Sequence, residues 1–114
     1  MNHDLVVEQS AVGSARVLTP AGDIDMARAP TVRKAVIAVL RDQPTKLVID
    51  LTSVRYVDSS GIATLVEALQ LSMRQKVKFV LVGISPRVQS AFEITKLVGL
   101  FTVCASVSEA TATP

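Results

Sequence analysis

Lys46–Leu69, KLVIDLTSVRYVDSSGIATLVEAL, decides the fold of this chain. Its first part, Leu47–Leu51, is apolar without alternation, which predicts a strand in the middle of a sheet, covered on both faces. Its last part, from Ser60 to about Gln75, repeats apolar residues at helical spacing and predicts an amphipathic helix. Between them, Asp58-Ser59-Ser60-Gly61 lies at the expected helix N-terminus, where free backbone N–H groups and the helix dipole favour negative charge. A phosphorylatable serine at this place would change the charge of the surface around it.

The rest of the chain predicts further strands and helices on both sides of this segment. Strands are expected at Leu5–Gln9, Ala15–Thr19, Val77–Val82 and Phe101–Cys104, and helices at Ala29–Leu40, from Pro86 and, briefly, from Ser106. Pro20–Asp25 is expected to be a loop, and Gly99 to cap the third helix, which buries Val88, Ala91, Phe92 and Leu97. This order predicts an α/β fold, a small mixed sheet of four to five strands with about four helices packed on it. Residues 1–114 are interpreted as a single domain, in which 106–114 is a short, frayed end.

Composition argues against several classes of function. Apolar residues make up 49% of the chain and aromatic residues only 4%, so we expect an aliphatic core. The net charge is +2 and the basic residues do not cluster, so nucleic acid is not an expected partner. Cys104 is the single cysteine; it is expected to be a small buried residue and can form no internal disulfide. The apolar runs are too short to span a membrane and no secretory signal is present, so a soluble cytoplasmic protein is expected.

The sequence offers no convincing catalytic, cofactor or metal site. His3, the only histidine, lies in a terminal segment, and the context of Ser59 is not a nucleophile elbow. Isolated glycines form no phosphate-binding loop, and no spacing of His, Cys, Asp or Glu suggests a metal. Asp23 and Asp25 resemble an acid–base pair only in type, because no catalytic partner accompanies them. We therefore expect a binding protein rather than an enzyme, with no cofactor.

The Asp58–Gly61 loop is explained either by helix capping alone or by a regulated site. Capping accounts for the aspartate or one serine, but it does not require two serines and a glycine. Gly61 inside a helix costs about 0.5–1 kcal/mol relative to alanine, so we expect another backbone or a partner to approach it closely. The helix is expected to bury Ile62, Leu65, Val66, Leu69 and Met73 and to expose Thr64, Glu67 and Leu71. Leu71 is then an isolated surface leucine or part of a partner contact.

Several segments resemble one known family. Tyr56–Val66, YVDSSGIATLV, is similar to the signature of STAS domains of the anti-sigma factor antagonist type. Gly22–Asp25 resembles the Gly-x-Leu-Asp turn of that family. Gly83–Leu97, Phe101–Val103 and Ser106–Ala110 resemble its third helix, closing strand and last helix. The resemblance therefore covers nearly the whole chain in the right order.

The resemblance implies a protein that binds an anti-sigma factor, itself a serine kinase, and so frees a sigma factor for RNA polymerase. It implies phosphorylation at Ser59, reversed by a PP2C-type phosphatase, and it places the Gly22–Asp25 turn beside the serine loop. Arg28 stands where the family often has a capping serine or threonine, so the first helix is expected to begin differently. The expected partner contacts are Asp23, Asp25, Asp58, Ser60 and Gly61, extended by Thr64, Glu67 and Leu71. The alternative is a STAS scaffold subunit without phosphorylation, in a signalling assembly or a lipid-transport complex.

Overall fold

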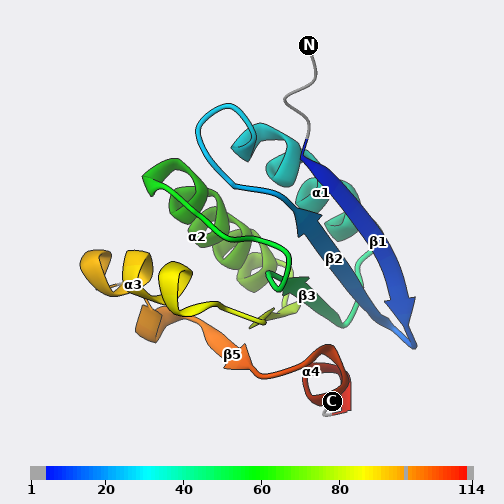
Figure 1. Ribbon diagram of the computed structural model, residues 1–114. Coiled ribbons are helices and arrows are strands. Elements are labelled where there is room, and N and C mark those ends of the chain that lie inside the picture. Colours follow the sequence, from blue (N-terminus) through cyan, green and yellow to red (C-terminus); the bar gives the residue numbers. More distant parts are fainter. Residues whose placement is uncertain (1–4, 97, 113–114) are drawn as a thin grey trace.

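The computed structural model describes residues 5–96 and 98–112, which form one five-stranded sheet with helices on both faces (Figure 1). The strands follow the order β1-β2-β3-β4-β5 across the sheet; β1 is antiparallel to β2 and the other neighbours are parallel. The strands are β1 (Val6–Val12), β2 (Ala15–Ala21), β3 (Lys46–Asp50), β4 (Lys78–Val82) and β5 (Thr102–Cys104). The helices are α1 (Ala29–Leu40), α2 (Ser59–Arg74), α3 (Pro86–Thr95) and α4 (Val107–Ala112), with a 3-10 turn at Val98–Leu100. The predicted α/β class and order of elements are confirmed.

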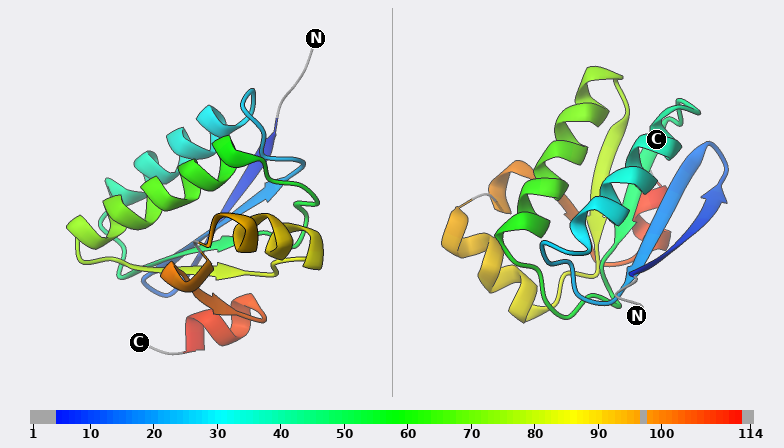
Figure 2. Two further views of the ribbon diagram at one scale, coloured as in Figure 1. Left: turned by 90° about the vertical axis from the view of Figure 1, so that its left-hand side faces the viewer. Right: turned by 90° about the horizontal axis from the view of Figure 1, so that it is seen from above.

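The sheet separates two apolar clusters, which explains the continuous apolar runs in its central strands. The larger cluster lies between the sheet and α1, α2 and α3, and it includes Leu47 and Ile49 of β3. The smaller cluster lies on the other face, where Val48 packs near Ala110 of α4. Figure 2 shows α1 and α2 on one side of the sheet and α4 on the other. Because β3 is covered on both faces, the residues that point to either side of the sheet are apolar.

Helix α2 buries Ile62 and Leu65 as predicted, and Val66 and Leu69 pack partly buried against the core, but the centre of its buried side differs from the prediction. Met73 is 66% exposed, whereas Ala68 and Ser72 are buried, at 2% and 0% exposed. The buried side follows Gly61, Ile62, Thr64, Leu65, Ala68 and Ser72. Small residues on this side let α2 approach its neighbours closely, and the buried Ser72 hydroxyl donates to the Ala68 carbonyl oxygen at 2.8 Å. The prediction relied on large apolar side chains, so it included Met73 and missed the small residues Ala68 and Ser72.

Other predicted boundaries also differ from the structure. Pro20 was expected in a loop but belongs to β2, where it lies opposite Val7. Strand β3 pairs with β2 only up to Leu18, so no hydrogen bond from an amide at position 20 to β3 is needed. Helix α3 ends at Lys96 in the left-handed conformation (φ 59°), and Gly99 lies in the 3-10 turn instead of capping the helix. Cys104 is partly exposed rather than buried, because β5 is a three-residue edge strand. The predictions for His3 and Leu97 concern residues outside the described ones.

Candidate regulatory and partner-binding site

The two loops that the sequence singled out lie side by side. Ile24 and Val57 form an isolated parallel bridge between the loop after β2 and the loop before α2. The Ile24 amide donates to the Tyr56 carbonyl oxygen at 3.0 Å, and the Asp58 amide donates to the Ile24 carbonyl oxygen at 3.2 Å. These backbone bonds hold the Gly22–Asp25 turn against the serine loop. The adjacency that the resemblance implied is confirmed.

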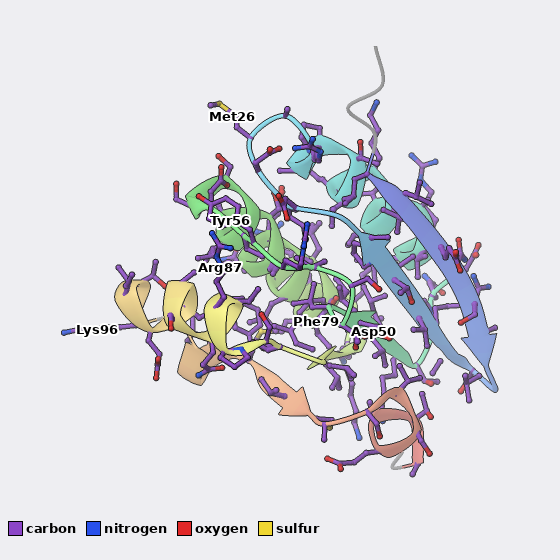
Figure 3. The ribbon with its side chains drawn as sticks, viewed as in Figure 1. Met26, Asp50, Tyr56, Phe79, Arg87 and Lys96 are labelled. Carbon is purple, nitrogen blue, oxygen red and sulfur yellow. The ribbon has the colours of Figure 1, made fainter. Side chains whose placement is uncertain are left out.

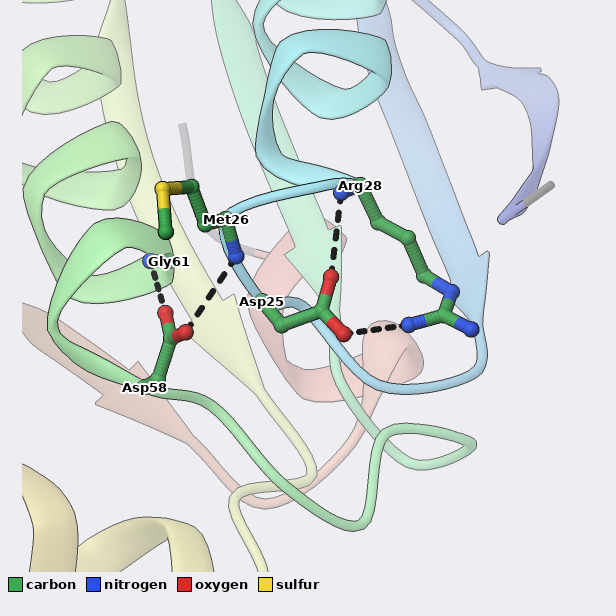
Figure 4. A network of polar contacts seen from close by, with 5 residues as sticks. All are labelled: Asp25, Met26, Arg28, Asp58 and Gly61. Atoms are coloured by element: carbon green, nitrogen blue, oxygen red, sulfur yellow. Dashed lines mark hydrogen bonds and ion pairs between the residues drawn. The ribbon is translucent and has the colours of Figure 1, made fainter. Parts of the chain in front are cut away.

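Asp58 caps α2 and ties it to the neighbouring loop. One carboxylate oxygen, Oδ1, accepts from the Gly61 amide at 3.0 Å, and Oδ2 accepts from the Met26 amide at 3.2 Å (Figure 4). One side chain thereby satisfies a free amide of the helix start and an amide of the other loop. With both oxygens engaged, Asp58 fixes the direction in which the first turn of α2 presents its side chains.

Removal of the Asp58 carboxylate is expected to destabilise the protein. Asp58→Ala loses the helix cap and the bond to Met26, so we expect a loss of about 1–2 kcal/mol in the free energy of unfolding. Asp58→Asn keeps one accepting oxygen for the Gly61 amide and serves as the matched control, with a smaller loss. Urea denaturation followed by circular dichroism measures both. Equal stability of wild type and Asp58→Ala would show that the cap contributes nothing.

Gly61 is buried against the backbone of the other loop. A Cβ atom added at Gly61 would lie 2.4 Å from the Ile24 carbonyl oxygen and 2.6 Å from Val57 Cγ1. Both distances are well below van der Waals contact, so only glycine fits here without a shift of the backbone. The expected close approach to Gly61 is therefore made by the protein itself. This buried residue lets the two loops pack together, and its role as a partner contact stays a prediction.

The first residue of α2, Ser59, is exposed to solvent. It precedes free helix amides, so a negative group on its hydroxyl would lie at the positive end of the helix dipole. Ser60 is half-buried, and its carbonyl oxygen accepts from the Thr64 hydroxyl at 3.0 Å. Ser59 is thus the serine of this loop whose side chain a second protein can reach most easily.

The side chain of Asp25 holds the start of α1, where the N-cap residue makes no capping bond. Its Oδ1 accepts from the Arg28 amide at 3.0 Å, and its Oδ2 pairs with the Arg28 guanidinium (Figure 4). Arg28 itself is the N-cap residue and makes no side-chain capping bond. The altered start of α1 is confirmed, because the chain enters the helix through a turn held by Asp25. The same engagement leaves Asp25 less available to a partner than Asp23.

The stripe of Thr64, Glu67 and Leu71 is less exposed to solvent than expected. Thr64 is 9% exposed, and Leu71 is partly buried against the larger core cluster. Glu67 pairs with Arg33 of α1, with 2.8 Å between Oε1 and Nε. The expectation of an outward stripe is therefore wrong for Thr64 and Leu71. Its role in partner binding stays a prediction, although the surface that it offers is small.

Three exposed side chains near the serine loop were not predicted from the sequence as part of the site. Met26 is 74% exposed and points away from the loop that Asp58 ties down (Figure 3). Arg55 and Arg87 line a hollow of about 330 Å³ together with Asp23 and Tyr56. Arg87 comes from α3, and no sequence spacing indicates that the start of α3 lies beside the loop before α2. These residues could be assigned only once the loops were placed in space.

Neither a membrane span nor a metal cluster is present in the described part of the chain. Among residues 5–96 and 98–112, every helix is too short or too polar to reach across a bilayer. Within the same ranges, no three His, Cys, Asp or Glu residues are placed to hold a metal ion together.

Comparison with known proteins assigns the family. The family model described as "STAS domain" matches residues 6–110. The chain belongs to the STAS domain family. This STAS domain is 39% identical over 77 residues to the anti-sigma-B factor antagonist of Listeria monocytogenes serovar 1/2a, a match that covers 68% of each chain.

Solved structures agree with that assignment. An anti-sigma factor antagonist from Mycobacterium paratuberculosis superimposes on the STAS domain with a TM-score of 0.85 and 26% identity, over 95% of this chain and 92% of that one. The Bacillus cell fate determinant SpoIIAA in its phosphorylated form superimposes with a TM-score of 0.71 and 16% identity, over 94% of this chain and 97% of that one. The latter likeness shows the fold alone.

Proposed function

We propose that the protein is an anti-sigma factor antagonist regulated at Ser59. Its unmodified form binds an anti-sigma factor that is also a serine kinase, and the sigma factor is thereby released. Relatives in the same family are named anti-sigma-B factor antagonist and anti-sigma factor antagonist, which supports this role. The single observation that carries the proposal is the exposed Ser59 at the start of α2, in a loop fixed by Asp58 and Gly61.

The phosphorylation step uses ATP, with its magnesium ion, and the partner kinase. The γ-phosphoryl group moves to Ser59 Oγ: a new O–P bond forms, the bond to the β-phosphate oxygen breaks, and ADP leaves. The hydroxyl proton passes to a base of the kinase. A PP2C-type phosphatase would return the serine by hydrolysis. Because ATP is the donor, this role places the protein in the cytoplasm.

The added charge is large enough to turn binding off. A phosphoserine carries about −1.5 to −2 charges at neutral pH. Asp58 and Asp23 lie in the two paired loops beside it, so the phosphate adds to negative charge that is already present there. A partner surface fitted to a neutral hydroxyl would have to bury this charge unpaired, which costs several kcal/mol. Each 1.4 kcal/mol is tenfold in affinity, so one phosphate suffices.

A kinase assay tests the proposal. Anti-sigma kinases encoded in the source genome would be purified one at a time and incubated with ATP and the protein. We expect one of them to add a single phosphate, located at Ser59 by peptide mass spectrometry. Ser59→Ala should accept none, whereas Ser60→Ala, the matched control, should still accept one. Binding of a kinase without any phosphate transfer would contradict the switch and would favour the scaffold alternative.

A further inference from the structure

The hollow beside the serine loop is positively charged. Two arginines, Arg55 and Arg87, line it against a single carboxylate, that of Asp23. Three other arginines of the described chain form ion pairs, whereas neither Arg55 nor Arg87 pairs with a carboxylate of the described residues. An unpaired guanidinium keeps its full capacity to bind an anion, because its five N–H donors are not committed to another acid.

The hollow is held in shape before any anion arrives. The guanidinium carbon of Arg87 lies 5.5 Å from the centroid of the Tyr56 ring, and the two side chains lie together in Figure 3. Stacking on the ring restrains the guanidinium plane and leaves its edge free for hydrogen bonds. The Tyr56 carbonyl oxygen accepts from the Ile24 amide, which holds the backbone that carries the ring. Arg87 is the second residue of α3, so the positive end of that helix dipole adds to the site.

Ser59 is close in sequence to two residues that line this hollow, Arg55 and Tyr56. It is three residues from Tyr56, so their Cα atoms are at most about 11 Å apart. This upper bound exceeds the Debye length of about 8 Å at physiological salt, but a phosphate and an arginine side chain both shorten the gap. The bridge between Ile24 and Val57 ties the hollow and the serine to the same pair of loops. A phosphate on Ser59 would therefore be attracted by Arg55 and Arg87.

We propose that the hollow is an intramolecular anion site that takes the phosphate of Ser59, with Arg55 and Arg87 donating charge-assisted hydrogen bonds to its oxygens. The inference rests on the proposed phosphorylation of Ser59. It accounts for the tolerance of a dianion beside Asp23 and Asp58. It also gives the switch a second element, since a filled hollow withdraws Tyr56 and both arginines from the surface that the unmodified protein offers to a partner.

The second pKa of the phosphoserine measures this capture directly. Phosphoserine would be installed at position 59 by stop-codon suppression, and the ³¹P resonance followed against pH. The ordinary value is about 6; the carboxylates of Asp23 and Asp58 raise it, and the arginines and the start of α2 lower it. An arginine about 10 Å away lowers the pKa by roughly 0.3 unit at the dielectric constant of water, and by more when it is closer. Arg55→Ala and Arg87→Ala should each raise the pKa by about that amount or more.

Two further variants make the result decisive. Arg74→Ala removes an arginine from the other end of α2, about 22 Å along the helix from Ser59, and should leave the pKa unchanged. Arg87→Lys keeps the charge without the guanidinium and should retain part of the effect. Amide spectra would show that Arg55→Ala and Arg87→Ala are folded. If the phosphoserine pKa in these two variants equals that in Arg74→Ala, the proposed capture is wrong. Because the phosphate is installed without a kinase, this test can fail while the kinase assay succeeds, and the reverse.

Discussion

Replacement of Ser59 by aspartate is expected to weaken binding of the anti-sigma partner by about 100-fold or more. Aspartate carries one negative charge at a position where the partner is proposed to meet a neutral hydroxyl. An uncompensated charge buried at an interface costs about 3 kcal/mol or more, which corresponds to about two decades of affinity. Ser59 is exposed, so we expect the substitution to leave the fold intact. Isothermal titration with the kinase identified by phosphorylation would measure the loss.

The matched control for this prediction is Ser108→Asp. Ser108 is an exposed serine of α4, the helix on the opposite face of the sheet. The same added charge there should leave the affinity nearly unchanged. Loss of binding in both variants would indicate a general effect of net charge, and unchanged binding in Ser59→Asp would rule out the proposed off state.

Replacement of Gly61 by alanine is expected to lower the free energy of unfolding by about 2 kcal/mol or more. The new methyl group would meet the Ile24 carbonyl oxygen and the Val57 side chain, and the backbone bond from Asp58 to Ile24 resists a shift. Overpacking of this kind costs about 1–3 kcal/mol, occasionally more. Alanine gains at most about 1 kcal/mol in helix propensity over glycine, and at a contact as close as this one the overpacking cost is larger. The melting temperature should fall by about 10 °C.

Gly99→Ala separates this packing effect from the general effect of removing a glycine. A Cβ atom at Gly99 has nothing within 4 Å, so the variant should melt close to wild type. Differential scanning calorimetry of both variants measures the difference. Equal melting temperatures for wild type and Gly61→Ala would mean that the two loops separate without loss, and that the serine loop is not held as described.

The sequence predicts the fold well where one physical signal dominates. Apolar runs mark β3 and β4, and Ala29–Leu40 shows helical periodicity. The helix expected from Pro86 begins there, and the Ser85 hydroxyl oxygen before it accepts from the Val88 amide as a helix cap. Predictions fail where packing decides: the buried side of α2 depends on small residues such as Ala68, and Lys96 takes the left-handed cap that Gly99 was expected to provide.

The candidate site divides in the same way. The Asp58–Gly61 motif is local, so its cap and its buried glycine could be anticipated from the sequence. That the Gly22–Asp25 turn lies beside the serine loop followed from the family resemblance, and the bridge between Ile24 and Val57 is a finding of the structure. Arg87 could not be foreseen, because it reaches Tyr56 from another helix. Contacts between distant segments are set by the sheet order, which the sequence alone does not specify.

Release of the sigma factor tests the central claim most directly. A purified complex of the anti-sigma kinase and its sigma factor would be mixed with unmodified protein or with protein carrying phosphoserine at position 59, and free sigma factor measured by gel filtration. The unmodified protein should release the sigma factor in proportion to its concentration, and the phosphorylated protein should release little at the same concentrations. Equal release by the two forms, or none by the unmodified form, would contradict the account.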